Sequence, residues 1–282
     1  MSTTMARTRE RSAYIVTYLR APDHDWPVDV GDDPSFVSSA GARRHGGAVT
    51  WGVCRADVRN ALRAGDLVVF FATDRLRDRR PARYAFVAFG LVAGKASQAA
   101  IWTDSSLELY RRYRNLLIRP RDGGFEHHEP GTPRKEWHKD WLWRIVENRS
   151  LKKAEVVVEG KSGYFVPGTR TENRTRTENR PLVVAQNYVL FRSEPSTMVL
   201  ADPPVVAEAG RAGASETWLA KPFAQELRTL LFSHGERRQL RTGNRYQPHR
   251  HIKVPNAAES LFDALTRFCD RHRLEGRHLD QI

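Results

Sequence analysis

The first hundred residues alternate between short apolar runs and turn residues. Residues 13–19 and 67–72 are almost continuously apolar, and residues 84–92 form a third run. Runs of this length, rich in β-branched and aromatic residues and bounded by Gly, Pro or Asp, predict buried strands. A weaker run over residues 48–54 predicts a short strand or turn that leads into a helix.

A helix is predicted over residues 56–64. Val58 and Leu62 lie four positions apart, so they share one face of that helix. The basic residues of this stretch share another face: Arg55, Arg59 and Arg63. Gly65 can adopt the left-handed conformation that ends a helix. Asp66 then either holds the following turn or presents its carboxylate to a ligand.

The middle of the chain is less regular. Residues 107–117 predict a basic helix, residues 120–140 a polar loop, and residues 181–191 another strand. Residues 22–47 are rich in Asp, Gly, Ser and Pro and predict a long loop, a feature that is often functional. Residues 168–180 contain a small duplication with no apolar period, which predicts a surface insertion.

Beyond residue 210 the apolar residues recur at helical spacing in two segments. Asn256 and Glu259 predict a capping box at the start of the second helix. The order of strand, helix, strand, turn and strand before that point is typical of an α+β protein. We therefore predict an α+β domain over residues 12–210 and a C-terminal helical extension over residues 211–282.

Charge indicates the class of partner. The chain carries 46 Lys and Arg against 33 Asp and Glu, which gives a formal net charge of +13. Such a surplus attracts polyanions at long range and is typical of nucleic-acid-binding proteins. The alternative is that Arg simply fills solvated faces. Seven clustered residues are expected to contact backbone phosphates: Arg43, Arg44, Arg55, Arg59, Arg63, Arg111 and Arg112.

Cysteine usage and hydropathy favour a soluble, cytoplasmic protein. The only cysteines are Cys54 and Cys269, too few for a disulfide framework or a Cys-based zinc site. Residues 1–11 are polar and basic, so no secretory signal is predicted. The longest apolar run, residues 67–72, is too short to span a bilayer, and we expect no membrane partner.

Three segments together resemble a known family. They are the Tyr-containing run at 14–18, the segment 49–55 with Cys54 near the helix start, and the segment 59–69 with Gly65 and Asp66 before a hydrophobic strand. This combination resembles the nucleotide modification associated domain of the second type over residues 13–200. It is more distantly similar to the PUA-like group that includes the ASCH, EVE and YTH domains. The resemblance implies a PUA-like curved β-barrel with packed helices and a pocket for one base.

A protein that reads one base needs a stacking aromatic and polar groups that face the base edge. The candidates for base binding are Trp51, Tyr18, Thr50, Asp66, Asn187 and Tyr188. Gly52 follows Trp51 directly and would let the backbone approach a ligand closely. The alternative for Tyr18 and Trp51 is a place in the core, since most aromatic residues pack there.

Motifs for catalysis or cofactors are weak. Cys54 has no His partner that the sequence identifies, so no catalytic residue is assigned. The run of Glu and His at 126–129 lacks zinc-site spacing, and no metal is predicted. Phosphate-binding glycine motifs are also missing from the sequence, so no cofactor is expected.

The sequence thus favours a nucleic-acid-binding protein that recognises a modified or flipped-out base. The family resemblance implies an association with DNA modification or phage defence, with DNA as a partner more than RNA and with DNA-modification enzymes as further partners. Two alternatives stay open. The chain could itself be an enzyme of nucleotide or base modification, or it could be a protein-interaction scaffold whose C-terminal helices form the partner surface.

Overall fold

We describe the fold from a computed structural model of the chain. The structure describes residues 11–19, 34, 49–52, 56–73, 82–113, 115–116, 118–121, 124–128, 158–159, 164–165, 186–209, 216–233, 240 and 251–276. The chain forms two compact units, each made of separate stretches. Unit 1 contains Met1–Pro27, Arg63–Val92 and Glu194–His278. Unit 2 contains Val28–Leu62, Ala93–Ser193 and Leu279–Ile282.

Unit 1 is built on a mixed, mostly antiparallel sheet. Its strands are β1 (Ala13–Leu19), β3 (Leu67–Thr73), β4 (Ala82–Ala96, in unit 1 through residue 92), β10 (Thr197–Val199), β11 (Val205–Ala209), β12 (Thr217–Trp218) and β13 (His251–Val254). Their order is β12-β11-β4-β3-β1-β13, and β10 also pairs with β4. The β1–β3 pair is parallel, whereas β13 runs antiparallel to β1.

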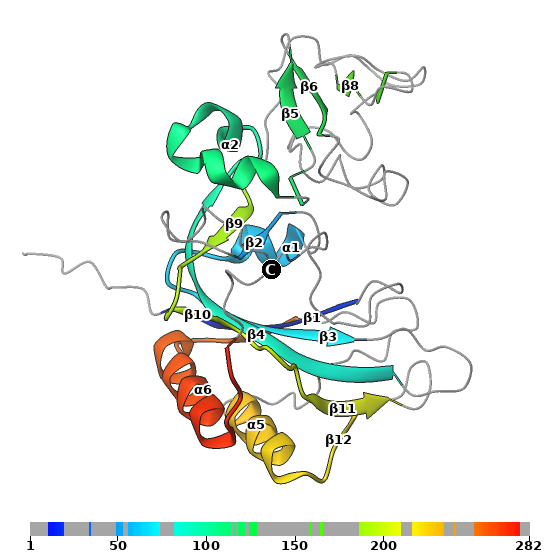
Figure 1. The fold of residues 1–282 in the computed structure, drawn as a ribbon, viewed down its shortest axis with the longest axis vertical. Coiled ribbons are helices and arrows are strands. Elements are labelled where there is room, and N and C mark those ends of the chain that lie inside the picture. Colours follow the sequence, from blue (N-terminus) through cyan, green and yellow to red (C-terminus); the bar gives the residue numbers. More distant parts are fainter. Residues whose placement is uncertain are drawn as a thin grey trace, which may run out of the picture. The chain divides into compact units, whose positions relative to one another are not determined.

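Helices α5 (Pro222–Phe232) and α6 (Ala258–His272) pack on one face of this sheet (Figure 1). Alternate residues of the strands point toward them, so Ile15 and Val69 share one buried cluster with Leu227 and Phe268. Full burial of each large apolar side chain contributes about 1.5–3 kcal/mol. The two helices therefore stabilise unit 1 chiefly through this apolar layer.

Unit 2 combines short helices with small sheets. Its elements are β2 (Thr50–Trp51), α1 (Ala56–Ala61), α2 (Ala100–Thr103), the 3₁₀ helix η2 (Ser105–Arg112), β5 (Ile118–Arg121), β6 (Gly124–His127), β7 (Val158–Glu159), β8 (Tyr164–Phe165) and β9 (Tyr188–Phe191). Strands β5-β6-β8-β7 form one sheet, and β9 pairs with β2 and with β4.

The α+β class and the strands at residues 13–19, 67–72 and 84–92 are confirmed. Over the described residues the large sheet is open, with β12 and β13 at its two ends, so the closed β-barrel was not found there. The described residues of the predicted extension, 211–282, belong to unit 1. Strand β13 pairs with β1, and α6 packs against β3. The units do not divide at residue 210.

Several local expectations differ from the structure. The predicted helix at 107–117 is the 3₁₀ helix η2, which ends where Tyr113 turns to extended backbone. The predicted loop at 120–140 begins with the β5–β6 hairpin. Helix α6 has no side-chain cap, because Ala257 occupies the N-cap position and Asn256 precedes it at a φ of 58°. The duplication at 168–180 and most of the loop at 22–47 lie outside the described residues.

Within the described part of the chain, no helix is long and apolar enough to cross a membrane.

Candidate functional site

Three buried polar side chains of unit 2 form a closed hydrogen-bonded group. The Tyr188 hydroxyl donates to Asn115 Oδ1 at 2.8 Å and contacts Thr50 Oγ1 at 3.1 Å. Asn115 Nδ2 donates to the Thr50 carbonyl oxygen at 3.2 Å and contacts Thr50 Oγ1 at 3.1 Å. The side chains are at most 2% exposed. Burial of such groups is favourable only because they satisfy one another.

A second amide fastens the backbone beside this group. Gln98 Nε2 donates to the Gly52 carbonyl oxygen at 3.1 Å and to the Asn115 carbonyl oxygen at 3.3 Å. Gln98 Oε1 accepts from the Ile118 backbone N–H at 3.3 Å. Gln98 therefore joins the chain after β2, the turn after η2 and the start of β5.

Gly52 is required by this packing. A Cβ at this position would lie 2.4 Å from two carbons of the Tyr188 ring and 2.9 Å from the Asn115 carbonyl oxygen. Ring and backbone atoms cannot move aside cheaply, so any larger residue would open the group. Gly52 was expected to let the backbone approach a ligand closely, and the group that lies against it is the Tyr188 ring.

A buried arginine joins α1 to the segment before β9. One Arg59 Nη donates to the Asn187 carbonyl oxygen and to Asn187 Oδ1, both at 2.6 Å. Asn187 Nδ2 donates to Asn60 Oδ1 at 2.6 Å, and Lys95 Nζ donates to the Arg59 carbonyl oxygen at 3.2 Å. Arg59 is fully buried. Arg59 was expected to contact backbone phosphate, but its side chain is buried and its guanidinium donates to Asn187.

Trp51 and Tyr188 do not form two walls of one slot. Strands β2 and β9 pair so that Thr50 lies opposite Leu190 and Trp51 opposite Val189. Side chains alternate across a strand, so Thr50 and Tyr188 share one face while Trp51 points to the other. Trp51 is 1% exposed. In this conformation it packs inside unit 2, as the alternative from the sequence had it.

Tyr18 and Asp66 belong to unit 1. Tyr18 is 6% exposed, and its ring meets the Phe70 ring edge-on at 6.5 Å between centroids. Asp66 accepts from the Ser12 backbone N–H at 2.9 Å and from the Arg63 backbone N–H at 2.8 Å. Both carboxylate oxygens thus hold the turn around Gly65, whose φ of +84° is left-handed as predicted. The turn alternative for Asp66 fits these bonds.

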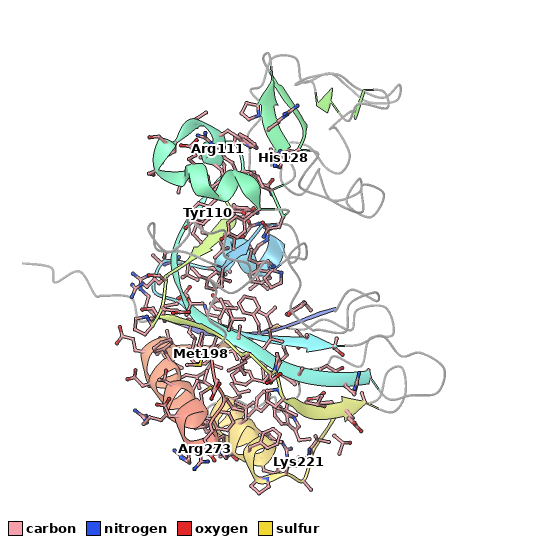
Figure 2. The ribbon with its side chains drawn as sticks, viewed as in Figure 1. Tyr110, Arg111, His128, Met198, Lys221 and Arg273 are labelled. Atoms are coloured by element: carbon pink, nitrogen blue, oxygen red, sulfur yellow. The ribbon has the colours of Figure 1, made fainter. Side chains whose placement is uncertain are left out.

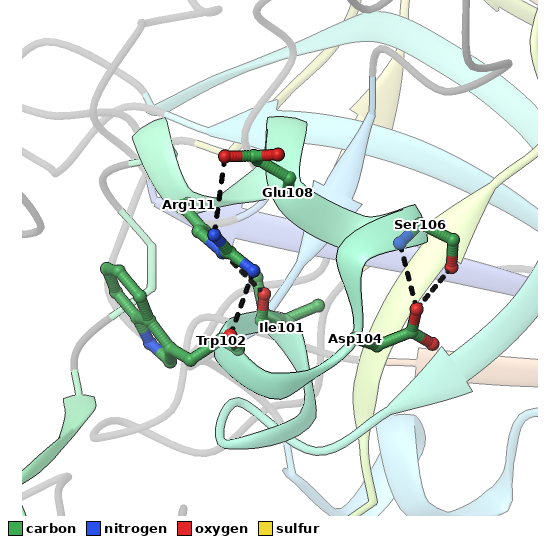
Figure 3. Close-up of polar contacts among 6 residues, drawn as sticks. All are labelled: Ile101, Trp102, Asp104, Ser106, Glu108 and Arg111. Atoms are coloured by element: carbon green, nitrogen blue, oxygen red, sulfur yellow. Dashed lines mark hydrogen bonds and ion pairs between the residues drawn. The ribbon is translucent and has the colours of Figure 1, made fainter.

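Arg111 is held by the chain around it (Figure 3). Its Nε donates to the Ile101 carbonyl oxygen at 3.0 Å, and one Nη donates to the Trp102 carbonyl oxygen at 2.8 Å. The other Nη pairs with Glu108 at 3.4 Å. The guanidinium therefore closes the end of α2 against η2. Figure 2 shows Arg111 beside Tyr110 and His128, whose Nε2 lies 3.1 Å from the Arg111 carbonyl oxygen.

The remaining predicted phosphate contacts are distributed as follows. Arg63 is exposed at the end of the segment after α1. Arg112 is the last residue of η2. Arg43, Arg44 and Arg55 lie outside the described residues, and so does Cys54.

Of the six predicted base-binding residues, the structure brings Thr50 and Tyr188 together around Asn115. Asn187 lies in the same unit but bonds to Arg59 and Asn60. Sequence reasoning missed Asn115 and Gln98, which complete the buried group. Asn115 lies in the Arg-rich stretch that predicts a basic helix over residues 107–117. Gln98 lies shortly after a predicted strand. A polar residue that is buried through distant partners leaves no local sequence signal.

Among the residues that the structure describes, no group of three or more His, Cys, Asp or Glu side chains is placed to hold a metal ion. No protein-family model, curated protein or solved structure matches the chain. Any assignment of function therefore depends on the chemistry of these residues and on the charge of the chain.

Proposed function

We propose that the protein binds nucleic acid and recognises a modified or flipped-out base through unit 2. The observation that carries the proposal is the buried group of Thr50, Asn115 and Tyr188 beside Trp51, in a chain with a formal net charge of +13. The charge supplies attraction for the phosphate backbone. The buried group supplies a rigid support for a recognition site.

The support for base recognition is chemical. Amide and hydroxyl side chains are the groups that read base edges, and an aromatic ring can stack on a base. In the described conformation these groups satisfy one another, so their role is to fix the backbone around Gly52 and Trp51. A recognition site needs such a second layer, because contacts that are loose by about 1 Å lose most of their selectivity.

The resemblance to the nucleotide modification associated domain of the second type adds the biological setting. This resemblance is the reason to propose DNA instead of RNA as the ligand. It is also the reason to propose DNA-modification enzymes as partners and a role in base modification or phage defence. We also propose that the fold is related to the PUA-like group. In this proposal unit 2 binds the base and does not modify it.

A binding screen tests the proposal directly. Fluorescent oligonucleotides, single-stranded and duplex, would carry either unmodified or modified bases and would be titrated with the full chain. We expect binding that weakens steeply between low and moderate salt and that differs by tenfold or more, about 1.4 kcal/mol, between the preferred base and the others.

The variant Tyr188→Phe separates the two parts of the proposal. It removes one hydroxyl without changing the charge, so the base preference should shrink while the salt dependence stays the same. Salt-insensitive binding, or no preference for any base, would contradict the proposal. Conversion of a base during the assay would instead favour the alternative of an enzyme.

A further inference from the structure

Three exposed cations surround the start of the β1–β3 pair in unit 1. Arg11 directly precedes β1, Arg63 lies before β3, and Lys253 stands on the edge strand β13. Only Arg63 was singled out as a phosphate contact from the sequence. We name the group of Arg11, Arg63 and Lys253 the β1 corner.

The sheet register places Lys253 on the sheet face opposite α5 and α6, where its own side chain is exposed. Tyr14 on β1 lies opposite Lys253 and opposite Val68. Their neighbours Ala13, Leu67 and Val254 belong to the cluster under the helices, so Tyr14 and Lys253 point to the other face. Lys253 Nζ lies 5.8 Å from the centre of the Tyr14 ring.

The two arginines meet the same turn. The stem of Arg11 lies over Gly65, since a Cβ built there would be 3.2–3.5 Å from Arg11 Nε, Cγ and Cδ. The Arg11 carbonyl oxygen accepts from the Ala258 backbone N–H at 3.3 Å, which fixes its backbone. Arg63 is near enough to Tyr14 to oppose the rise in pKa that burial and Asp66 cause in that phenol.

The carboxylate of Asp66, which lies beside the β1 corner, already accepts two backbone hydrogen bonds. Asp66 is 4% exposed, and its two oxygens accept the backbone N–H groups of Ser12 and Arg63. It holds the turn and does not form an ion pair with a guanidinium in any contact described. The corner thus presents three exposed cations beside a buried carboxylate that is already engaged by backbone N–H groups.

We propose that the β1 corner is a phosphate-binding surface of unit 1 that contacts the nucleic-acid backbone. This inference rests on the proposed function, and it adds a second contact region outside unit 2. Arg and Lys contacts of this kind position the strand without reading its sequence. Each phosphate neutralised by such a residue adds about 0.7–0.9 to the slope of log K against log salt.

The test compares two triple variants of the full chain with a fluorescent DNA oligonucleotide over a salt series. The first is Arg11→Gln, Arg63→Gln and Lys253→Gln. The matched control removes the same charge from the helical face, at Lys221→Gln, Arg267→Gln and Arg273→Gln. Figure 2 marks Lys221 and Arg273 of this control set. Thermal melting would verify that both variants fold.

We expect the slope of log K against log salt to become shallower by about 2–3 in the β1-corner variant. The control variant should keep the wild-type slope. The single variants Lys253→Gln and Arg63→Gln should each lose about 1. Equal losses in both triple variants, or an unchanged slope in the first, would overturn the β1 corner while leaving the proposed function intact. A wild-type chain that shows no salt-dependent binding would instead overturn the proposed function, and the β1 corner with it.

Discussion

The two units bury different chemistry. Unit 1 packs its helices on an apolar cluster that includes Phe86, Leu227 and Phe268. Unit 2 encloses a group of amides and hydroxyls in which Asn115 contacts both Thr50 and Tyr188. Apolar packing is non-directional and tolerates small shifts, whereas a buried polar group is stable only with every partner in place. The Thr50–Asn115–Tyr188 group therefore depends on every one of its members, whereas the apolar cluster of unit 1 can adjust to small changes.

Truncation in unit 1 should give the largest effect. Phe268 is fully buried and meets the Phe86 ring edge-on at 6.3 Å between centroids. We expect Phe268→Ala to lower the free energy of unfolding by about 3–5 kcal/mol, because it removes apolar contacts and leaves a cavity. Urea denaturation of the wild type and the variant measures this loss in the free energy of unfolding. A loss below about 1 kcal/mol would mean that the helices do not depend on this layer.

The close approach at Gly52 should give the next largest effect, now in unit 2. We expect Gly52→Ala to cost about 2–3 kcal/mol, because the new Cβ would overlap the Tyr188 ring. Gly94→Ala is the control, since a Cβ at Gly94 meets nothing within 4 Å. The same denaturation measurement applies. Equal effects at the two glycines would contradict the packing around Tyr188.

Deletion of one hydroxyl tests whether the polar group acts as a unit. Tyr188→Phe should cost about 1–2 kcal/mol, because it leaves Asn115 Oδ1 and Thr50 Oγ1 each short of a buried partner. Thr50→Val should have a similar cost. A double variant whose loss is smaller than the sum of the two would show the coupling expected of groups in contact.

An alkaline titration separates the buried thiol of unit 1 from the buried tyrosines. In unit 1, burial and the neighbouring Asp270 raise the pKa of Cys269 to about 12 from 9.0. Above pH 9 the unfolded thiol ionises while the folded thiol keeps its proton, so stability falls with pH by about 1.4 kcal/mol per unit. Between pH 9 and 10 we expect a loss of about 1 kcal/mol that Cys269→Ala abolishes.

In unit 2 the corresponding groups respond at a higher pH. Burial raises the pKa of Tyr110 and of Tyr113 above 10.0, so their contribution to stability is lost only as pH rises beyond 10. Because burial also raises the pKa of Tyr14 in unit 1, melting temperatures of the Cys269→Ala variant over pH 8–11 would be compared with and without Tyr110→Phe and Tyr113→Phe. A decline that begins at pH 9 in that variant would contradict the assignment to the tyrosines.

The sequence predicted the central strands of unit 1 well. Strands β1, β3 and β4 are buried on both faces, and such strands appear as continuous apolar runs. The short strands β11 and β13 were missed. Their few residues mix apolar and charged side chains, and their pairing partners lie far away in the chain. Long-range pairing of this kind overrides local pattern.

The candidate site was predicted only in part. Thr50 and Tyr188 were named, but the residues that join them were not. Arg59 was named for another role: its helical spacing with Arg55 and Arg63 predicts a phosphate contact, yet it is buried and donates to Asn187. A buried charge depends on a specific partner, and the sequence does not say which distant residue will supply it.

The pairing of β1 with β13 has a consequence for synthesis. β1 is made well before β13, so Ile15 meets its partner Ile252 only after the intervening strands and helix α5 have been made. Until β13 has been made, β1 can pair with β3 along one edge. Its other edge then presents unpaired backbone N–H and C=O groups. An unpaired strand edge is a template for aggregation. Premature termination between β12 and β13 should therefore yield a nascent chain that requires chaperones or is degraded.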